Sequence, residues 1–538
     1  MLPGLMQPRS LMISDILAHA ARAHPEREIV SRLVDEPDWR YDYERCAGRV
    51  AKAANMLRAA GVQPGDRVSS LAWNTHRHFE LFYAVTGIGA VLHTANPRLH
   101  PDQIAYTINH AGSDILFFDR NFLPLVEELA SRLPAIKRYV MLSDEERLVR
   151  GTLDADSYEV LLADAAPIAQ WPRFDEGGAA FLCYTSGTTG DPKGVLYSHR
   201  SVVLHALAGG LSGAFGLTAF DTVMPCASLY HATAWGLPFT APINGCKLVF
   251  PCDRMDGASL HELIVNEGVT FTGGVPTIWT MYLAHLEATG GTPGVLKRVV
   301  IGGSAVPRSM AQAFQKQYEV SVMQIWGMTE ISPIGVLSTP TPALAEGGAG
   351  HVDEIIWTRQ GRLQFGLELK IVDEEGEELP WDGEASGALF VRGPWAIERY
   401  YRSDAKAADD DGWFDTGDIA SIDRFGFLRI TDRAKDVIKS GGEWISSIDI
   451  ENVAAAFPGV RVAAVVGVYH PKWEERPILI VEPHEGSPLS LAEISDYLAR
   501  SLVKWWQPDD ILIAEIPLTA TGKIDKKALR ERYRSHLG

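Results

Sequence analysis

The sequence lacks the features of several common protein classes. Its 50 Lys and Arg residues are outnumbered by 68 Asp and Glu residues, which gives a formal net charge of −18. Proteins that bind nucleic acids or membrane surfaces usually carry clusters of basic residues. We therefore expect no nucleic-acid partner and no membrane partner, although small anionic ligands could still bind where the local charge is positive.

Cysteines and long apolar segments are also scarce. The five cysteines form no Cys-x-x-Cys pair, and an odd number spread over a long chain does not suggest a disulfide framework. Residues 1–26 contain no basic segment followed by an apolar core, as a secretory signal would. The most apolar later run, residues 202–217, is interrupted by glycines and is too short to cross a bilayer comfortably. These observations predict a cytoplasmic protein with reduced, buried thiols and a glycine-containing buried helix.

Three familiar catalytic motifs are missing as well. There is no G-x-G-x-x-G fingerprint of a dinucleotide-binding fold and no G-x-S-x-G motif of a serine hydrolase. The segment YTSGTTGDPKG, residues 184–194, is rich in glycine and hydroxyl residues but does not match a Walker P-loop. Pro192 stands where the second glycine would be, and Gly194 follows Lys193 where a P-loop has Ser or Thr. The hydroxyl that holds magnesium in a P-loop is therefore absent here.

The chain does contain a clear alternation of strands and helices. From about residue 65 to residue 330, short apolar runs such as AAFLCY and KRVVIGG alternate with helical stretches such as PTIWTMYLAHLEA, a pattern typical of parallel sheets covered by helices. Between about 360 and 433, short strands joined by Gly, Asp and Pro turns indicate a small β-barrel or meander. Helix–strand alternation then resumes on a smaller scale. We predict an α/β protein with parallel-rich sheets in an N-terminal domain at 1–433, and a small mobile α/β domain at 434–538.

The glycine-rich segment has the chemistry of a phosphate-binding loop. It follows a plausible strand, and ligands in open α/β sheets bind at strand ends. Glycines let the backbone approach an anion and point N–H groups toward it, while hydroxyl groups and Lys193 add donors and positive charge. A lone glycine-rich segment could equally be a flexible surface loop. Six adjacent Ser, Thr and Gly residues at 185–190, closed by Pro-Lys-Gly, favour the phosphate loop.

The same segment resembles the phosphate-loop signature of the acyl-adenylate-forming superfamily, which includes acyl-CoA synthetases, peptide-synthetase adenylation domains and luciferases. Further segments are similar to the other signatures of that family and follow in its order. They are IGGSAVP (301–307), IWGMTE (325–330), GALFVRGP (387–394), GWFDTGDIA (412–420), ITDRAKDVIKSGGEWIS (430–446) and PLTATGK (517–523). The resemblance covers essentially the whole chain. It implies that a carboxylic acid attacks ATP to give an acyl-adenylate and pyrophosphate, and that coenzyme A then displaces AMP.

The resemblance also implies roles for individual residues. Because the acid and ATP are both negative, catalysis consists mainly of positioning and charge neutralisation. Lys523 would neutralise the carboxylate and the α-phosphate, Thr329 would hydrogen-bond the α-phosphate, and Glu330 would hold Mg²⁺, with His231 as a further catalytic residue. A metal held by Glu330 would explain why the loop needs no hydroxyl after its lysine. The residues expected to bind ATP, with Asp418 and Arg433 at the ribose, are Thr185, Ser186, Gly187, Thr188, Thr189, Gly190, Lys193, Gly302, Gly303, Ser304, Trp326, Gly327, Met328, Asp418, Ile430 and Arg433.

The acyl pocket implied by the resemblance is mostly apolar, which predicts an uncharged acyl tail. Its residues are His231, Trp235, Val275, Gly302, Ile331, Pro333 and Ile334. Trp235 could close the acyl tunnel, or it could be a core aromatic on a buried helix, and the sequence leaves both readings open. The style of the motifs resembles the short- and medium-chain branch of the acid–CoA ligases. That branch includes ligases of 3-methylmercaptopropionate, a small apolar thioether acid that we take as a specific candidate.

The second half-reaction concerns the C-terminal domain. The family turns this domain about a hinge, which falls at Lys435 in this chain. The turn would bring a CoA-binding segment to the active site. Its residues are Lys439, Ser440, Gly441, Gly442, Glu443 and Trp444. The resemblance is also compatible with a homodimer.

Three alternatives remain. A standalone adenylation enzyme could load a carrier protein, but a peptide-synthetase domain would need an aspartate near LYHATAWG (229–236), which offers no acid. Such a domain would also usually adjoin a carrier domain, whereas the chain ends 15 residues after Lys523. A luciferase-like oxygenase has no feature in its favour. A non-catalytic protein of the same fold would be expected to lose Lys523 or Glu330, and both are present.

Overall fold

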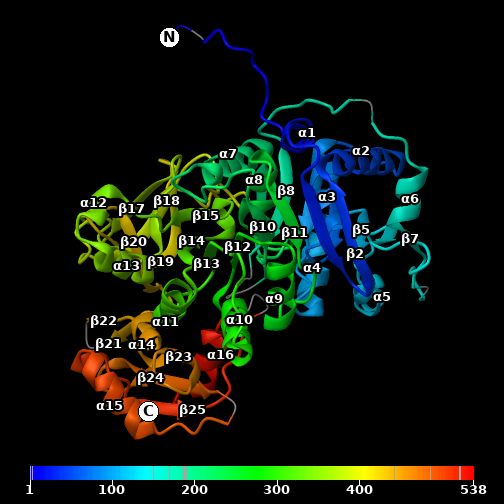
Figure 1. Ribbon diagram of the computed structural model, residues 1–538. Coiled ribbons are helices and arrows are strands. Elements are labelled where there is room, and N and C mark those ends of the chain that lie inside the picture. Colours follow the sequence, from blue (N-terminus) through cyan, green and yellow to red (C-terminus); the bar gives the residue numbers. More distant parts are fainter. Residues whose placement is uncertain are drawn as a thin grey trace.

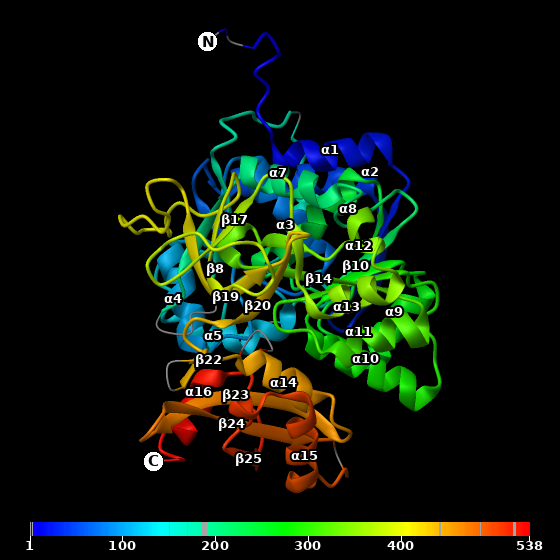
Figure 2. The same ribbon diagram turned by 90° about the vertical axis from the view of Figure 1, so that its left-hand side faces the viewer.

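The computed structural model describes residues 2, 4–149, 151–168, 170–185, 191–440, 443–484, 486–519 and 523–537, with the backbone alone at 443–444. It confirms the predicted α/β architecture: two large sheets carry helices, and the C-terminal residues form a smaller sheet domain beneath them (Figure 1). A quarter turn of the molecule shows the small domain, coloured orange to red, against one end of the large part (Figure 2). Within the described residues, no helix is long and apolar enough to cross a membrane.

The first large sheet has seven strands, and all but its last pair run parallel. Its order is β7-β6-β5-β3-β4-β8-β9, with β8 and β9 antiparallel. The strands are β3 (Arg67–Leu71), β4 (Val91–Thr94), β5 (Ile115–Phe118), β6 (Arg138–Met141), β7 (Ala155–Ser157), β8 (Ala179–Tyr184) and β9 (Gly194–Ser198). Its central strands β5, β3 and β4 are buried along most of their length, as expected for strands covered on both faces. The predicted strand AAFLCY is β8, and the glycine-rich segment connects it to β9.

The second large sheet has thirteen strands and changes from parallel to antiparallel across its width. Its parallel block runs β1-β11-β10-β12-β13-β14, with β2 antiparallel at the β1 edge. These strands are β1 (Glu28–Leu33), β2 (Glu36–Asp42), β10 (Thr222–Pro225), β11 (Lys247–Phe250), β12 (Phe271–Gly274), β13 (Arg298–Gly302) and β14 (Ser321–Gly327). The neighbouring strands β12, β13 and β14 end side by side, which brings the motifs that follow them together.

Beyond β14 the same sheet continues as an antiparallel run in the order β15-β16-β20-β19-β18-β17. Its strands are β15 (Ile334–Leu337), β16 (Gly361–Leu363), β17 (Glu368–Val372), β18 (Gly387–Arg392), β19 (Phe414–Ile422) and β20 (Phe427–Arg433). They include the small β part expected at about 360–433, in its meander form. Among the described strand pairs, none joins β17 to β15. The run is attached to the parallel block through β16, which pairs with β15, and through β15, which pairs with β14.

Helices fill the space between the two large sheets and cover other faces. α3 has the most enclosed position: it contacts β4 and β8 of one sheet and β1 of the other, and all 12 of its residues are buried. The helices of the large part are α1 (Ile13–Ala23), α2 (Tyr43–Ala59), α3 (His76–Gly87), α4 (Pro101–Ala111), α5 (Leu123–Ala130), α6 (Tyr158–Asp164), α7 (His199–Gly210), α8 (Leu237–Ile243), α9 (Gly257–Asn266), α10 (Pro276–Thr289), α11 (Arg308–Gln312), α12 (Pro342–Ala345) and α13 (Ala349–Thr358). The first part of the glycine-containing apolar run, residues 202–210, lies in α7, which is largely buried as predicted, whereas residues 211–217 follow the end of the helix.

The C-terminal domain is built on a sheet in the order β22-β21-β24-β23, with β25 parallel to β24. Its elements are β21 (Ile438–Ser440), β22 (Glu443–Ile445), β23 (Val460–His470), β24 (Glu474–Pro483), β25 (Asp510–Ile513), α14 (Ser447–Ala455), α15 (Leu491–Ser501) and α16 (Lys526–Tyr533). Successive residues of β23 enter different apolar clusters: Val465 belongs to one, and Ala464 and Val466 to another. Because side chains alternate along a strand, both faces of the sheet are covered.

Candidate nucleotide-binding active site

Glycines allow the ends of β13 and β14 to lie against their neighbours. A Cβ at Gly302 would lie 2.3 Å from Ile325 Cγ2 and 2.6 Å from Ile325 O, and a Cβ at Gly327 would lie 2.0 Å from Pro333 O. Gly303 has a φ of +86°, which favours glycine over residues with side chains. These contacts with backbone atoms leave no room for a side chain. Gly302 is buried, Gly303 is half-buried and Ser304 is exposed, so the segment where an adenine was expected runs from the interior to the surface.

The expected ribose contacts form one cluster with the expected adenine aromatic. Asp418 on β19 lies opposite Arg433 on β20, and the Arg433 Nε atom lies 2.8 Å from Asp418 Oδ1. The Trp326 indole donates to Asp418 Oδ2 at 2.8 Å. Burial raises the pKa of Asp418, while the Arg433 charge and the Trp326 hydrogen bond lower it. Ile430, also on β20, donates its N–H to Gln360 Oε1 at 2.7 Å.

Thr329 and Glu330 lie on a short 3₁₀ turn, η4 (Thr329–Ile331), directly after Met328 at the end of β14. Both residues are buried. The Tyr197 hydroxyl donates to the carbonyl oxygen of Thr329 at 2.5 Å, and the Tyr400 hydroxyl donates to Glu330 Oε1 at 2.8 Å. Neither tyrosine is predicted from the sequence. Their partners lie 132 and 70 residues away, so no local motif signals these contacts.

The two ends of the expected phosphate loop are described, and they contact each other. The Thr185 N–H donates to the carbonyl oxygen of Lys193 at 2.9 Å, and the Lys193 N–H donates to Thr185 Oγ1 at 3.2 Å. The Lys193 Nζ atom lies 4.8 Å from the centroid of the Tyr400 ring. The loop therefore leaves and re-enters the sheet close to the turn that carries Glu330. The residues of the loop that lie outside the described part of the chain are Ser186, Gly187, Thr188, Thr189 and Gly190.

Lys523 reaches this cluster from the C-terminal domain. A Cβ at Gly303 would lie 3.9 Å from Lys523 Cε, which places the lysine side chain against the end of β13. The pKa of Lys523 is lowered to about 8, chiefly by burial and also by the Arg433 charge, while the Asp418 and Glu330 carboxylates oppose the shift. Two large-domain carboxylates and a large-domain guanidinium thus act on this one lysine. The structure therefore brings the last predicted motif of the chain to the middle ones.

The residues expected to form the acyl pocket gather around the same strand ends. A Cβ at Gly303 would lie 3.1 Å from Val275 Cγ1, and a Cβ at Gly273 on β12 would lie 3.6 Å from Trp235 Cε3. Burial and, to a lesser extent, the nearby Lys523 charge lower the pKa of His231 to about 4, so the imidazole is neutral at pH 7. Of the remaining residues, Gly302 ends β13, while Ile331 and Pro333 lie in the turn after β14 and Ile334 begins β15.

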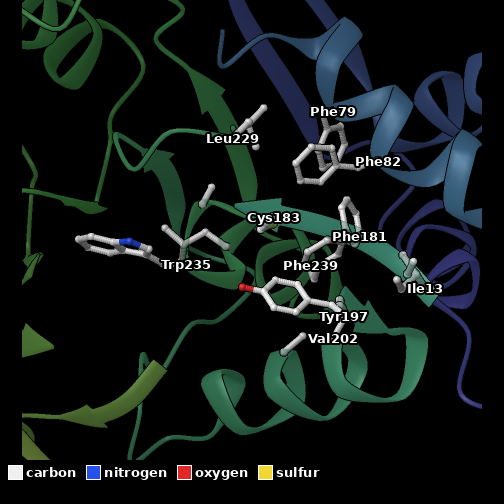
Figure 3. Packing of buried hydrophobic residues seen from close by; sticks show 14 of the residues in the cluster. Ile13, Phe79, Phe82, Phe181, Cys183, Tyr197, Val202, Leu229, Trp235 and Phe239 are labelled. Carbon is white, nitrogen blue, oxygen red and sulfur yellow. The ribbon is translucent and has the colours of Figure 1, made fainter. Parts of the chain in front are cut away.

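Trp235 lies on an unusual turn and not on the buried helix that the sequence also allowed. Residues 232–235 have φ values of 40°, 43°, 51° and 57°, all in the left-handed region, and α8 begins only at Leu237. For residues with side chains this conformation costs roughly 1–2 kcal/mol each. The indole is 7% exposed and belongs to the same buried apolar cluster as Phe79, Phe82, Phe181 and Phe239, although it projects away from these four rings (Figure 3). Within this cluster the turn places the indole beside Gly273, near the end of β12.

The expected CoA-binding segment contacts its own domain in this structure. The Lys439 N–H donates to Glu475 Oε2 at 3.0 Å, and the Ser440 hydroxyl accepts from Arg476 Nη1 at 3.2 Å. Gly441 and Gly442 lie outside the described residues, as do the side chains of Glu443 and Trp444. The expected hinge, Lys435, lies between β20 and β21, in a turn closed by the Asp436 N–H and the Arg433 carbonyl oxygen at 2.8 Å.

Three cations and two buried carboxylates therefore surround the strand ends. Lys193, Arg433 and Lys523 supply positive charge for an anionic ligand, and Asp418 can accept hydrogen bonds from hydroxyl groups. Because the three cations come from separate segments, and Lys523 from the other domain, they can contact several negative groups of one polyanion. Asp418 adds an acceptor for the hydroxyl groups of a sugar on the same ligand. The arrangement can also bind a second anion next to this ligand, because the Lys523 ammonium group can contact both anions at once.

Comparison with known proteins gives a consistent picture. Residues 17–401 match the family described as AMP-binding enzyme, and residues 449–523 match the AMP-binding enzyme C-terminal domain. The chain is 43% identical to a 3-methylmercaptopropionyl-CoA ligase of Ruegeria lacuscaerulensis, over 99% of each chain. It is 44% identical to a medium-chain-fatty-acid–CoA ligase of Ectopseudomonas oleovorans, over 98% of this chain and 97% of the other. The crystal structure of the anthranilate CoA ligase AuaEII in complex with anthranoyl-AMP has a TM-score of 0.86 at 24% identity, over 98% of both chains, a likeness in fold.

Proposed function

The chain belongs to the AMP-binding enzyme family, and from this premise we propose that it is an ATP-dependent acid–CoA ligase. A carboxylic acid and ATP would give an acyl-adenylate and pyrophosphate, and the thiol of coenzyme A would then take the acyl group and release AMP. The observation that carries the proposal is the position of Lys523, from the C-terminal domain, beside Asp418, Arg433 and the end of β13. The names of both relatives support coenzyme A as the acyl acceptor.

The contacts support a role for each residue in the first step. The acid carboxylate would attack the α-phosphorus, with Lys523 holding the approaching oxygens and Thr329 donating to the α-phosphate. A carboxylate accepts about four hydrogen bonds, and Asp418 has two protein donors in the described residues, so two ribose hydroxyls can still bind it. Neutral His231 would face the acyl carbonyl and Lys193 the terminal phosphates. Pyrophosphate leaves with the electrons of the broken P–O bond.

The same residues fit a magnesium ion. No group of three or more His, Cys, Asp or Glu residues that could hold a metal occurs among the described residues. Mg²⁺ at nucleotide sites is usually bound through one or two carboxylates together with substrate phosphates, so a single carboxylate is sufficient. Glu330 would be that ligand: it is buried, it lies beside the end of the phosphate loop, and one of its oxygens accepts no hydrogen bond from another described residue. The ion would neutralise phosphate charge.

We expect adenylate formation to fall as the pH rises above about 8. Lys523 must be protonated to neutralise two anions, and its pKa in the free protein is lowered to about 8. The kcat/KM for ATP reports the free enzyme, and should drop about tenfold per pH unit above that value. Pyrophosphate release measured from about pH 6 to about pH 10 tests this. An ordinary lysine, with a pKa of about 10.4, would stay mostly protonated over this range and would give no such fall. Lys523→Arg is the control, because arginine stays charged and should remove the fall; a flat wild-type profile would contradict the pKa.

The lining of the pocket supports an acid with an uncharged tail. Apart from His231, its residues are apolar or glycine, and no charged side chain is among them. The two relatives act, by their names, on 3-methylmercaptopropionate and on medium-chain fatty acids, both of which have uncharged tails. We propose a short- or medium-chain acid of this kind, with 3-methylmercaptopropionate as the specific candidate. We place the protein in the cytoplasm, since all five cysteines are unpaired and buried and ATP and coenzyme A are supplied there.

Trp235→Ala should shift the preference toward longer acids. If the indole closes the acyl tunnel, its removal opens space for several methylene groups, each contributing roughly 0.8 kcal/mol of binding. Two added carbons would then change kcat/KM about tenfold, while the shortest acids lose activity because they are held less firmly. The kcat/KM is measured over saturated acids of increasing length, together with the melting temperature. A destabilised protein with an unchanged profile would show instead a purely structural tryptophan.

An acid panel tests the proposed function as a whole. Release of AMP is followed with each acid and ATP, with and without coenzyme A. We expect pyrophosphate from the acid and ATP alone, and rapid AMP release only when coenzyme A is added. Adenylate formation without any thioester would favour an enzyme that loads a carrier protein, and light or oxygen consumption would favour an oxygenase. No pyrophosphate with any acid would contradict the proposal.

A further inference from the structure

One side chain touches both charged groups that flank the expected phosphate site. Tyr400 donates its hydroxyl to Glu330 Oε1 at 2.8 Å. The Nζ atom of Lys193, at the end of the phosphate loop, lies 4.8 Å from the centroid of the Tyr400 ring. The polar end of Tyr400 therefore holds the carboxylate, and the face of its ring attracts the ammonium group. Glu330 and Lys193 come from different sheets, and Tyr400 is the link between them.

The backbone around Tyr400 is attached to the same two segments. The Ile397 N–H donates to the carbonyl oxygen of Glu330 at 2.8 Å, and the Tyr401 N–H donates to the carbonyl oxygen of Gly194 at 2.8 Å. Tyr400 lies between these two attachments. Its backbone is thus fixed to the turn of Glu330 on one side and to the residue after Lys193 on the other. A side chain supported in this way can hold a functional group within a narrow range of positions.

We propose that Tyr400 is a positioning residue that sets the Glu330 carboxylate and the Lys193 ammonium relative to each other for the phosphates of ATP. The inference rests on the proposed function, because it takes ATP as the ligand between these groups. With Oε1 held by the phenol, Oε2 accepts no hydrogen bond from any other described residue. Glu330 would therefore bind Mg²⁺ through this single oxygen. Hydrogen bonds that orient a metal-binding carboxylate typically account for about ten- to a hundredfold in affinity.

Binding measurements on two neighbouring tyrosines test the proposal. Tyr400→Phe removes the hydroxyl and keeps the ring beside Lys193. Tyr401→Phe is the matched control, because the Tyr401 hydroxyl donates to the carbonyl oxygen of Ala111 at 3.2 Å, away from both charged groups. ATP binding to the full-length proteins is measured by calorimetry, once with Mg²⁺ and once with EDTA. We expect Tyr400→Phe to bind Mg–ATP about tenfold more weakly and metal-free ATP as wild type does, and Tyr401→Phe to match wild type in both.

A double variant shows whether the hydroxyl acts through Glu330. Tyr400→Phe combined with Glu330→Gln should bind Mg–ATP no more weakly than Glu330→Gln alone, since groups that act together give non-additive effects. In the reaction, the Mg²⁺ concentration for half-maximal pyrophosphate release should rise about tenfold in Tyr400→Phe and stay unchanged in Tyr401→Phe.

Three results would overturn the proposal. They are equal Mg–ATP affinity in Tyr400→Phe and wild type, additive losses in the double variant, or an equal loss of Mg–ATP and metal-free ATP binding with a lower melting temperature, which would indicate a structural tyrosine. Failure of the proposed function looks different. If wild type bound Mg–ATP but formed no adenylate from any acid, the reaction would be wrong, while the binding comparison would still decide the role of Tyr400.

Discussion

Replacement of Lys523 by alanine should slow acyl-adenylate formation by about a hundred- to a thousandfold. Lys523 lies against the end of β13, and Arg433, Asp418 and Glu330 are close enough to shift its pKa. Its ammonium group is therefore placed where the acid carboxylate would meet the α-phosphate. Loss of one preorganised donor to developing charge typically costs this much in rate. The rate is measured as acid-dependent pyrophosphate release at saturating ATP and acid.

The second half-reaction provides the contrast. When the acyl-adenylate is supplied directly, Lys523→Ala should form the thioester at nearly the wild-type rate, because the C-terminal domain would have turned this lysine away. Lys527→Ala is the matched control: Lys527 is an exposed lysine four positions further on, and its loss should leave both steps unchanged. Near-native adenylate formation by Lys523→Ala would show that another group neutralises the reacting anions.

The parts of the fold that local sequence determines could be predicted. Buried parallel strands read as short apolar runs, so β8 and β13 were recognisable from AAFLCY and KRVVIGG. Most strands of the small C-terminal sheet pair antiparallel, but they too are covered on both faces and were recognisable as short apolar runs. The attachment of the antiparallel strands to the large sheet was not, because the β14–β15 and β16–β20 pairings join segments whose own sequences do not identify their partners.

The predicted site residues came from motifs, and the residues that support them did not. Trp326 and Asp418 each lie in a motif, but the hydrogen bond that joins them spans 92 residues and follows only from the fold. Tyr197 and Tyr400 lie in no recognised motif and are found through their contacts with Thr329 and Glu330. Sequence similarity to a family identifies the groups that touch substrate more readily than the groups that hold them.

The turn that carries Trp235 shows a second limit. A left-handed run normally signals itself through glycine, yet residues 232–235 are Ala, Thr, Ala and Trp, and only Gly236 follows the rule. Nothing in these residues distinguishes the turn from the buried helix that the sequence also allowed. The surrounding structure imposes it, and strain of this kind tends to accumulate at functional sites. The position of Trp235 at the strand ends, beside β12, is therefore a property of the tertiary structure.

The orientation of the C-terminal domain depends on contacts made directly across the expected hinge. Before the hinge, Asp432 on β20 accepts from the backbone N–H and the hydroxyl of Ser447 on α14, at 2.7 and 2.6 Å. Arg429 likewise pairs with Asp449 at 2.5 Å. These contacts join the large domain to the small one in the orientation that places Lys523 at the site. A rotation about Lys435 would have to break them, so a second orientation would differ in the backbone angles of the expected hinge and in these pairs.

Lys435→Pro should slow thioester formation by about a hundredfold and leave adenylate formation largely intact. Proline fixes φ near −65°, and a misplaced proline costs about 3 kcal/mol, which would lower the population of the second orientation roughly a hundredfold. A small loss in the first step is expected too, since Lys435 is the third residue of the turn closed by Asp436 and Arg433, a position that disfavours proline. Each half-reaction is measured separately, as pyrophosphate release without coenzyme A and as thioester formation from supplied acyl-adenylate. Lys435→Ala is the control, because it removes the side chain and leaves φ free, so thioester formation should continue. Equal losses of both steps in Lys435→Pro would place the hinge elsewhere in the segment between β20 and β21.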